Sequence, residues 1–413
     1  MRRYPALLAR LARAALVPVL AAATVLTVAA PAQAATLTQV TGFGSNPGNL
    51  TMYAYRPDGL PAGAPAVVLL HGCAQNANGY FSNSGWRKYA DQWGFALIVP
   101  EQKSANNATS CFNWFETGDT SRGQGEALSI RQMVEHARTS FGVAADRVYV
   151  SGLSGGGAMV AAMLAAYPDA FAGGSVVAGI PYRCATTMVN AFSCMNPGVN
   201  RTPAQWGDLV RSAYPGYSGP RPRVAIWHGA ADYTVATANA TESRDQWTNV
   251  LGVSQTPTGT SSLPGGTTLE TYGADQVRVY RVAGMGHGTP VDPGSGADQC
   301  GSTAAYFLDT ICSAYRDALF FGLDSGGSPG DPGDPGDPGD PGDPGDPGDP
   351  GDPGDPDPVC VTASNYAHVQ AGRAYQSLGY TYAAGSGQLM GLYNTFLSTE
   401  LRQTAPGHWV IGC

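Results

Sequence analysis

Residues 148–158 read Val-Tyr-Val-Ser-Gly-Leu-Ser-Gly-Gly-Gly-Ala and join three local signals in one short segment. The run Val148–Val150 predicts a strand, and the small and apolar residues from Ala158 to Tyr167 predict a helix. Between them, Ser154 stands in a Gly-x-Ser-x-Gly pattern. A sharp strand-to-helix turn exposes a serine hydroxyl at the top of a sheet, where a histidine can take its proton and backbone amides can hold an oxyanion. Ser154 is therefore the predicted nucleophile.

The flanking strand and helix, rather than the pattern itself, carry this prediction. Residues 326–330, Gly-Gly-Ser-Pro-Gly, match the same pattern and lie in an obvious linker. A plain turn serine is therefore the alternative for Ser154.

Two later loops supply catalytic partners for Ser154, so that the three residues follow one another in the chain order serine, aspartate, histidine. Residues 224–229 predict a buried strand, and Asp232 lies on the loop beyond it. The alternating strand predicted for Val277–Val282 leads into a glycine-rich loop that carries His287. We expect Asp232 to orient His287, which serves as the general base.

Other acids and histidines compete for these roles. Asp208, Asp245 and Asp275 are alternatives to Asp232, because a single sequence fixes the position of an acid poorly. His71 and His228 each end a predicted buried strand beside a glycine, which favours a structural role in a turn.

A further predicted strand, Ala66–Leu70, opens into His71-Gly72-Cys73. In α/β-hydrolases a His-Gly turn at this place directs a backbone amide toward the reacting carbonyl. The backbone amides of Cys73 and Gly155 are the predicted oxyanion hole. Trp114 is a candidate to line the acyl pocket in a substrate-binding role, with a buried structural role as the alternative.

Strand and helix signals alternate from about Ala35 to Leu323, which predicts a mostly parallel sheet with helices on both faces, an α/β-hydrolase fold. The predicted strands are Ala66–Leu70, Phe95–Val99, Val148–Ser151, Ser175–Ala178, Val224–His228 and Val277–Val282, and the predicted helices are Glu126–Phe141, Ala158–Tyr167, Glu242–Leu251 and Ala304–Phe321.

The amino terminus has the features of a signal peptide, residues 1–34. Four arginines precede the apolar run Ala14–Ala30, and Ala32-Gln33-Ala34 provides a small-residue cleavage signature. We expect secretion, with a mature chain that begins near Ala35 and has no membrane partner after cleavage. An uncleaved membrane anchor is the alternative.

Eight cysteines in an exported chain predict disulfides. Spacing favours the pairs Cys184–Cys194 and Cys300–Cys312, Cys73 with Cys111 would brace the oxyanion turn, and Cys360 and Cys413 bracket the C-terminal segment. Neither Cys-x-x-Cys nor His-Glu-x-x-His occurs, so we expect no zinc site. The expected serine chemistry requires no metal, and we expect no cofactor.

Residues 324–358 form a predicted linker that contains nine consecutive Gly-Asp-Pro triplets. Proline at every third position and the self-repulsion of the aspartates predict a stiffened spacer, and a collagen-like helix is the alternative. The ten aspartates from Asp331 to Asp357 outweigh the net charge of −8. The remainder is nearly neutral and has no basic, aromatic-laced patch, so no nucleic-acid partner is expected.

Residues 359–413 predict a small disulfide-stapled C-terminal module that is rich in aromatic residues. On a long spacer, such a module would keep an enzyme close to an insoluble polymer by raising the effective concentration. The alternative is that these aromatic side chains form the core of the module.

Five ordered motifs carry a resemblance to a known family. They are His71-Gly72-Cys73-Ala74-Gln75, Cys111-Phe112-Asn113-Trp114-Phe115, the serine motif Gly152 to Met159, the aspartate motif His228 to Val235, and Gly286-His287-Gly288. Between Leu60 and Phe320 the chain resembles the secreted polyhydroxybutyrate depolymerase family of esterases, which adjoins the feruloyl and acetylxylan esterases of carbohydrate esterase family 1.

This resemblance implies a serine, aspartate and histidine triad at Ser154, Asp232 and His287. It also implies hydrolysis of an insoluble short-chain polyester such as poly(3-hydroxybutyrate) through an acyl-enzyme. Removal of feruloyl or acetyl groups from cell-wall polysaccharide is the first alternative, and a non-catalytic polymer-binding protein is the second. The oligomeric state is left open. The acidic Gly-Asp-Pro spacer departs from the threonine-rich or fibronectin-like linkers of many polymer-degrading members.

Overall fold

The computed structural model describes residues 35–324 and residues 360–412, except 378–379, 393–397 and 406. The predicted signal peptide, nearly all of the predicted linker, the second Gly-x-Ser-x-Gly match and Cys413 lie outside these residues. Within the part described, no helix has both the length and the apolar character needed to cross a membrane.

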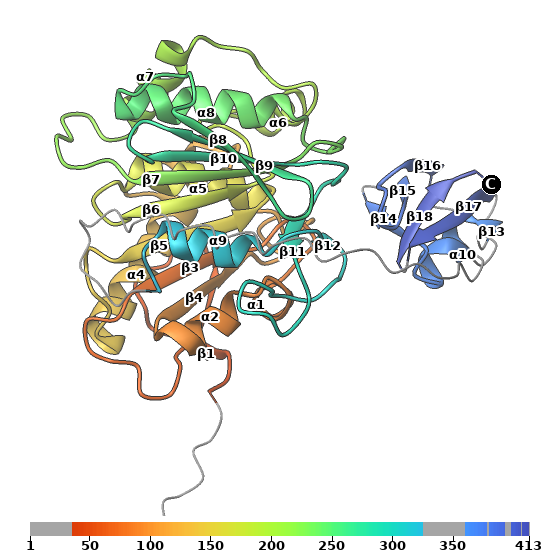
Figure 1. Cartoon of the computed structure of the whole chain (residues 1–413). Coiled ribbons are helices and arrows are strands. Elements are labelled where there is room, and N and C mark those ends of the chain that lie inside the picture. The colour runs from red at the N-terminus through yellow and green to blue at the C-terminus, as the bar shows by residue number, and fades with distance from the viewer. Residues whose placement is uncertain (1–34, 325–359, 378–379, 393–397, 406, 413) are drawn as a thin grey trace, which may run out of the picture. The chain divides into compact units, whose positions relative to one another are not determined.

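A ten-stranded sheet organises residues 35–324 (Figure 1), with the strand order β1-β2-β4-β3-β5-β6-β7-β10-β9-β8. The six strands from β4 to β10 in this order are parallel, and the two strands at each edge are antiparallel. The bounds are β1 Thr38–Val40, β2 Thr51–Tyr55, β3 Ala66–Leu70, β4 Ala96–Glu101, β5 Val148–Leu153, β6 Gly173–Val177, β7 Arg223–Gly229, β8 Gly259–Leu263, β9 Thr267–Tyr272 and β10 Val277–Val282. The predicted mostly parallel sheet is confirmed.

Helices cover both faces of the sheet because its central strands are apolar on both sides. In β3 every residue is buried, and alternate side chains enter two different cores, Val68 and Leu70 on one face and Val67 and Leu69 on the other. The first core also contains residues of α4 Gly125–Phe141, α5 Gly155–Ala166, α7 Pro203–Ala213 and α8 Ala238–Leu251, and the second contains residues of α1 Ala77–Asn83, α2 Trp86–Trp93 and α9 Ser313–Phe320. The remaining helices of this part are α3 Thr117–Thr120 and α6 Met188–Met195.

The predicted helix Ala304–Phe321 is correct only in its second half. Residues 307–309 form the short strand β12, which pairs with β11 Thr289–Val291, and α9 begins at Ser313. Tyr306 has a left-handed backbone with φ 66°, which an α-helix does not accommodate. Pairing with a distant strand therefore overrides the local helical pattern.

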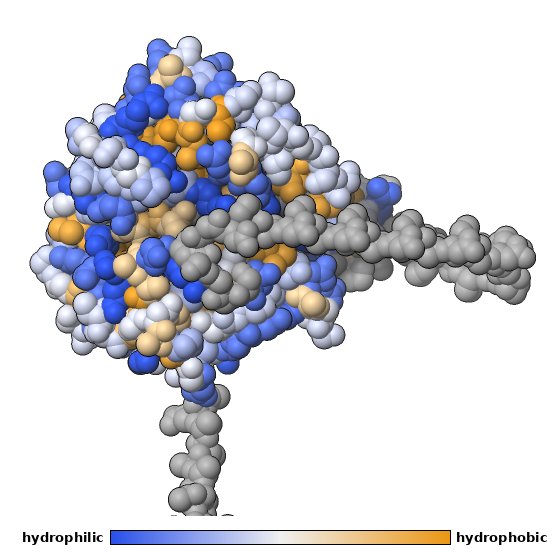
Figure 2. All heavy atoms as spheres, turned by 60° about the vertical axis from the view of Figure 1, so that its left-hand side comes forward, coloured by the Kyte–Doolittle hydropathy of each residue, from blue (hydrophilic) through white to orange (hydrophobic). Residues whose placement is uncertain are grey.

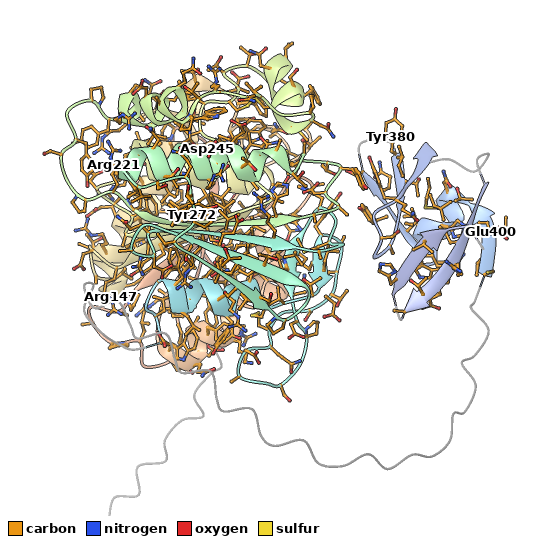
Figure 3. The ribbon with its side chains drawn as sticks, turned by 45° about the horizontal axis from the view of Figure 1, so that its top comes forward. Arg147, Arg221, Asp245, Tyr272, Tyr380 and Glu400 are labelled. Carbon is orange, nitrogen blue, oxygen red and sulfur yellow. A yellow bond between two sulfur atoms is a disulfide. The ribbon has the colours of Figure 1, made fainter. Side chains whose placement is uncertain are left out.

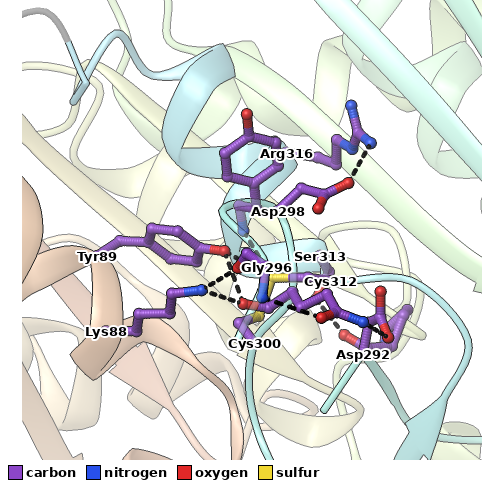
Figure 4. Close-up of a disulfide and its surroundings, with 12 residues drawn as sticks. Lys88, Tyr89, Asp292, Gly296, Asp298, Cys300, Cys312, Ser313 and Arg316 are labelled. Atoms are coloured by element: carbon purple, nitrogen blue, oxygen red, sulfur yellow. Dashed lines mark hydrogen bonds and ion pairs between the residues drawn. A yellow bond between two sulfur atoms is a disulfide. The ribbon is translucent and has the colours of Figure 1, made fainter. Parts of the chain in front are cut away.

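The disulfide between Cys300 and Cys312 closes the segment that contains β12 (Figure 4). Cys300 and Cys312 are bonded to each other, and the Lys88 ammonium group on α2 donates to the carbonyl oxygens of Gly296 and Gln299. The Cys300–Cys312 and Cys73–Cys111 bridges match the sequence predictions, as does Cys184–Cys194. Cys360 is also disulfide-bonded.

The C-terminal module contains two small antiparallel sheets, with strand orders β13-β17-β18 and β14-β15-β16. Its elements are β13 Cys360–Ser364, α10 Asn365–Gln370, β14 Ala374–Ser377, β15 Tyr380–Ala383, β16 Leu389–Leu392, β17 Ser398–Ala405 and β18 His408–Ile411. Trp409 is buried in its small core with Leu401 and Met390, whereas Tyr380 is exposed (Figure 3). Trp409 therefore contributes to the core of the module, whereas Tyr380 is accessible for contact with a polymer.

A buried carboxyl group, Asp317 on α9, lies beneath the sheet. Its Oδ1 accepts a hydrogen bond from Trp227 Nε1 at 2.8 Å, and the Trp227 ring stacks on Tyr280 with 3.7 Å between centroids. Burial raises the pKa of Asp317 to about 7. Because the folded pKa lies above the unfolded value, the contribution of this group to stability is complete below the unfolded pKa of 3.8 and is lost as the pH rises through about 7.

We predict that Asp317→Asn flattens the pH dependence of stability. Asparagine keeps the acceptor for Trp227 and does not ionise, so the free energy of unfolding should fall less between about pH 5 and pH 8 than in the wild type, by a few kcal/mol at most. Urea denaturation of both proteins at each pH measures this difference. Parallel pH profiles for the two proteins would contradict it.

Candidate active site

Ser154 occupies a strained turn between β5 and α5. Its backbone has φ 56° and ψ −117°, and α5 begins at the next residue, three residues earlier than predicted. A left-handed conformation is costly for a serine and recurs at functional turns. Its amide donates to the carbonyl oxygen of Val177 at the end of β6, at 2.8 Å.

Glycines beside this serine allow the backbone of three segments to meet. A Cβ atom added to Gly156 would lie 2.3 Å from the carbonyl oxygen of Leu70 and 2.6 Å from that of His71. One added to Gly152 would also crowd the Leu70 carbonyl oxygen, at 2.8 Å. Only glycine fits such contacts with rigid backbone. The serine turn is therefore packed directly against the end of β3, where the His71 turn begins.

Asp232 and His287 are in direct contact. His287 Nδ1 lies 2.7 Å from Asp232 Oδ2, and both side chains are buried. The second oxygen, Oδ1, accepts the backbone N–H groups of Thr234 and Val235 at 2.9 Å each. Burial by itself would raise the pKa of Asp232, but His287, His228 and the Val235 N–H lower it. A carboxylate only accepts, so the imidazole proton lies on Nδ1 and the lone pair on Nε2.

The loops that carry these residues meet at one edge of the sheet. The Ser154 amide bonds to β6, Ala178 bonds to the Trp227 carbonyl of β7, and Ala230 bonds to the Val282 carbonyl of β10, each at 2.8 Å. These bonds link the carboxyl ends of β5, β6, β7 and β10, the edge where doubly wound sheets place their sites. The structure thus brings the predicted acid and base together and places the predicted nucleophile at the same edge.

The alternative acids lie elsewhere and have arginine partners. Asp208 pairs with Arg211, Asp245 with Arg244, and Asp275 with Arg278. His228 is buried with Nε2 2.9 Å from the Val235 carbonyl oxygen, and burial lowers its pKa. Through Val235, His228 holds the loop that carries Asp232, which is the structural role expected of a turn residue.

His71 orients the peptide that follows it. Burial lowers its pKa to about 4, and its Nε2 accepts the backbone N–H of Gln102 at 3.1 Å. Nδ1 therefore carries the proton and donates to the Gly72 carbonyl oxygen at 2.8 Å. In a trans peptide the carbonyl and the next N–H point in opposite directions, so the Cys73 N–H is turned away from the His71 ring.

The Cys73–Cys111 disulfide and Trp114 pack against the residue that follows Ser154. A Cβ atom placed on Gly155 would lie 3.0 Å from Cys73 Sγ and 3.5 Å from Trp114 Cδ1. Trp114 is only 7% exposed and belongs to an apolar cluster with Ile180 and Val235. The predicted site residue Trp114 thus lies beside the serine turn, and its burial also supports the structural alternative.

Glu126 is a buried residue of this region that sequence reasoning placed only as the start of a helix. Its Oε2 accepts the Asn113 N–H at 2.8 Å, Oε1 accepts Asn113 Nδ2 at 2.8 Å, and the Gln102 side-chain amide also donates to it. Burial, with a contribution from Asp119, raises its pKa to about 8. The carboxyl group ties α4 to the loop of Cys111 and Trp114 and to Gln102, the partner of His71.

Little in the sequence distinguishes Glu126 from a surface residue. A glutamate in the first turn of a helix is favoured by the helix dipole whether or not it is buried.

Among the described residues, no group of three or more His, Cys, Asp or Glu side chains is arranged to hold a metal ion.

Comparisons with known proteins agree with this architecture. A family model described as esterase PHB depolymerase matches residues 50–270. The poly(3-hydroxyalkanoate) depolymerase C of Paucimonas lemoignei is 53% identical over 292 residues, which is 70% of each chain. An acetylxylan esterase of Coprinopsis cinerea is 40% identical over 261 residues, 62% of this chain and 69% of that protein.

A solved structure is similar as well. The acetyl xylan esterase from Aspergillus awamori superimposes with a TM-score of 0.61 at 28% identity, covering 70% of this chain and 99% of that one. The family resemblance inferred from the five sequence motifs is confirmed. The chain is a carboxylic-ester hydrolase and belongs to the esterase PHB depolymerase family.

Proposed function

We propose that this chain is a secreted serine esterase that hydrolyses a short-chain polyester such as poly(3-hydroxybutyrate). The observation that carries the proposal is the buried Asp232–His287 pair, which lies at the same sheet edge as the strained Ser154 turn. The 53% identity to a poly(3-hydroxyalkanoate) depolymerase favours a polyester over other esters.

In the proposed mechanism, His287 Nε2 takes the proton of Ser154 as its Oγ attacks the ester carbonyl carbon. The backbone N–H groups of Cys73 and Gly155 stabilise the oxyanion that develops. His287 then protonates the leaving alcohol, and an acyl-enzyme on Ser154 results. Water attacks this ester with the same base, which releases the acid and restores the serine. Asp232 holds the imidazole tautomer throughout, and no step requires a metal or cofactor.

Secretion and domain division belong to the same proposal. Three disulfides within residues 35–324 suit an oxidising compartment. We assign residues 1–34 as the signal peptide, 35–323 as the catalytic domain, 324–358 as the linker and 359–413 as a C-terminal module with a role in holding the substrate.

A second candidate substrate is an acetylated or feruloylated cell-wall polysaccharide, favoured by the acetylxylan esterase relatives. The two substrates are distinguished by offering the full-length protein a poly(3-hydroxybutyrate) suspension and, separately, acetylated and feruloylated xylan. Clearing of the suspension supports the polyester. Release of acetate or ferulate alone would assign the protein to cell-wall esterases.

We predict that Ser154→Ala abolishes acyl transfer and that Asp232→Asn lowers kcat on a soluble short-chain ester by about 10⁴-fold. An asparagine amide at position 232 no longer fixes the Nδ1–H tautomer of His287. Asp208→Asn, at an exposed alternative acid, is the matched control and should keep wild-type turnover. Residual activity of Ser154→Ala close to the wild type would remove Ser154 from the mechanism, and so would a burst of acyl-enzyme in that variant.

A further prediction concerns the oxyanion turn. His71→Phe keeps the ring that packs on Phe112 but deletes both hydrogen bonds of the imidazole, so the Gly72–Cys73 peptide loses its fixed orientation. We expect kcat to fall by up to about a hundredfold with little change in KM, because the lost interaction acts on the transition state. His136→Phe on α4 is the matched control. A rise in KM of the same size as the expected fall in kcat, with kcat itself unchanged, would contradict this role of His71.

A further inference from the structure

Exposed large apolar side chains in the described part of residues 35–324 are concentrated in one place. Met188, Val189 and Phe192 are 54%, 80% and 61% exposed, and Tyr233 is 71% exposed. The first three occupy one side of α6, and Tyr233 directly follows Asp232. We call these four residues the α6 patch. Figure 2 shows one face of the molecule, on which hydrophilic residues interrupt the apolar areas.

The α6 patch is attached to the loop of the proposed catalytic acid. Asn196, just beyond α6, donates its side-chain amide to the Tyr233 carbonyl oxygen at 2.9 Å. The Ala236 amide donates to the Met195 carbonyl oxygen at 2.8 Å. The Cys184–Cys194 disulfide closes the same segment. These bonds hold α6 and the Asp232 loop as one unit, so the patch has a fixed position at the rim of the site.

The underside of α6 connects the patch with the serine turn. Ala191 and Cys194 on that side are buried in the apolar cluster that contains Trp114. Trp114 in turn lies next to Gly155, as described above. The buried side of α6 therefore belongs to the same apolar cluster as Trp114, the side chain that lies beside Gly155.

The chemistry of the segment is uniformly neutral. Residues 184–200 contain no Asp, Glu, Lys, Arg or His. A monomeric protein gains nothing in solubility from four exposed large apolar side chains, and such patches mark surfaces that bind another apolar surface. A polysaccharide presents many hydroxyl groups that need polar partners, whereas a solid aliphatic polyester presents methyl and methylene groups without charge.

We propose that the α6 patch is a docking surface for the apolar face of a solid polyester and delivers a polymer chain to Ser154. The proposal rests on the proposed function and adds a polymer contact within the catalytic domain itself, separate from the C-terminal module. It assigns Val189 and Phe192 the largest share, because they expose the most side chain on α6.

The test compares polymer and soluble substrate with the full-length protein. In Val189→Ser/Phe192→Ser, the rate of poly(3-hydroxybutyrate) film erosion at low enzyme concentration should fall at least tenfold more than kcat/KM for a soluble short-chain ester. Val189→Ile/Phe192→Leu stays apolar and should retain erosion. Equal losses on both substrates, or no loss of erosion, would overturn the proposal.

A gain-of-contact variant keeps the test decisive if the double serine variant fails to fold. Asn190→Leu adds an apolar side chain at an exposed position of α6, and Thr139→Leu adds one at an exposed position near the end of α4. Adsorption to polymer granules should rise for Asn190→Leu and stay unchanged for Thr139→Leu. Equal adsorption of the two variants would contradict the proposal.

Two other outcomes separate this proposal from competing explanations. Light scattering that shows a wild-type dimer and a monomeric Val189→Ser/Phe192→Ser variant would assign the patch to self-association and overturn the proposal. A wild-type protein that hydrolyses the soluble ester but never erodes the polymer would refute the proposed polyester function itself, and the docking surface with it.

Discussion

The close contact between the glycines around Ser154 and the end of β3 is the constraint on which the active edge depends. Because Gly156 lies against the carbonyl oxygens of Leu70 and His71, the turn that carries the serine and the turn that carries Cys73 have a fixed separation. No side chain mediates this contact, so it leaves little freedom for adjustment. The two predicted donors of the oxyanion hole, Cys73 and Gly155, belong one to each of these turns.

The other half of the site is held by loops that follow β7 and β10. Asp232 is fixed by the amides of its own turn, and the segment after His287 is fixed by pairing of β11 with β12. The Cys300–Cys312 disulfide closes the segment that contains β12, and Lys88 holds the loop just before it through the Gln299 carbonyl oxygen. A histidine on a glycine-rich loop thereby gains a defined position from contacts with segments on both sides of it.

Sequence patterns predicted the parts of the molecule that depend on local signals. The predicted strands at 66–70 and 277–282 have the observed bounds, since a short apolar run and an alternation of valine with polar residues are both local signals. Spacing predicts the pairs Cys184–Cys194 and Cys300–Cys312, and the expected brace of the oxyanion turn predicts Cys73–Cys111. Position in the chain favours Asp232 over its competitors. Its contact with His287 is consistent with that choice.

The features that sequence reasoning missed are set by tertiary contacts. The stretch 304–312 has a helical pattern, yet residues 307–309 pair with β11. Glu126 has the sequence signature of an exposed helix start, and only the approach of Asn113 and Gln102 makes it a buried acceptor. The exposure of Met188 and Phe192 likewise follows from which side of α6 packs against the body of the domain, a choice that an evenly apolar segment does not specify.

The distribution of the disulfides ties the catalytic edge to the redox state of its surroundings. Cys73–Cys111 braces the His71 turn, Cys184–Cys194 closes the α6 segment, and Cys300–Cys312 anchors the strand beside the His287 loop. The sheet itself contains none of these bonds. The loops around the site are therefore braced by bonds that depend on the oxidation of six cysteines, whereas the hydrogen bonds of the sheet do not depend on it.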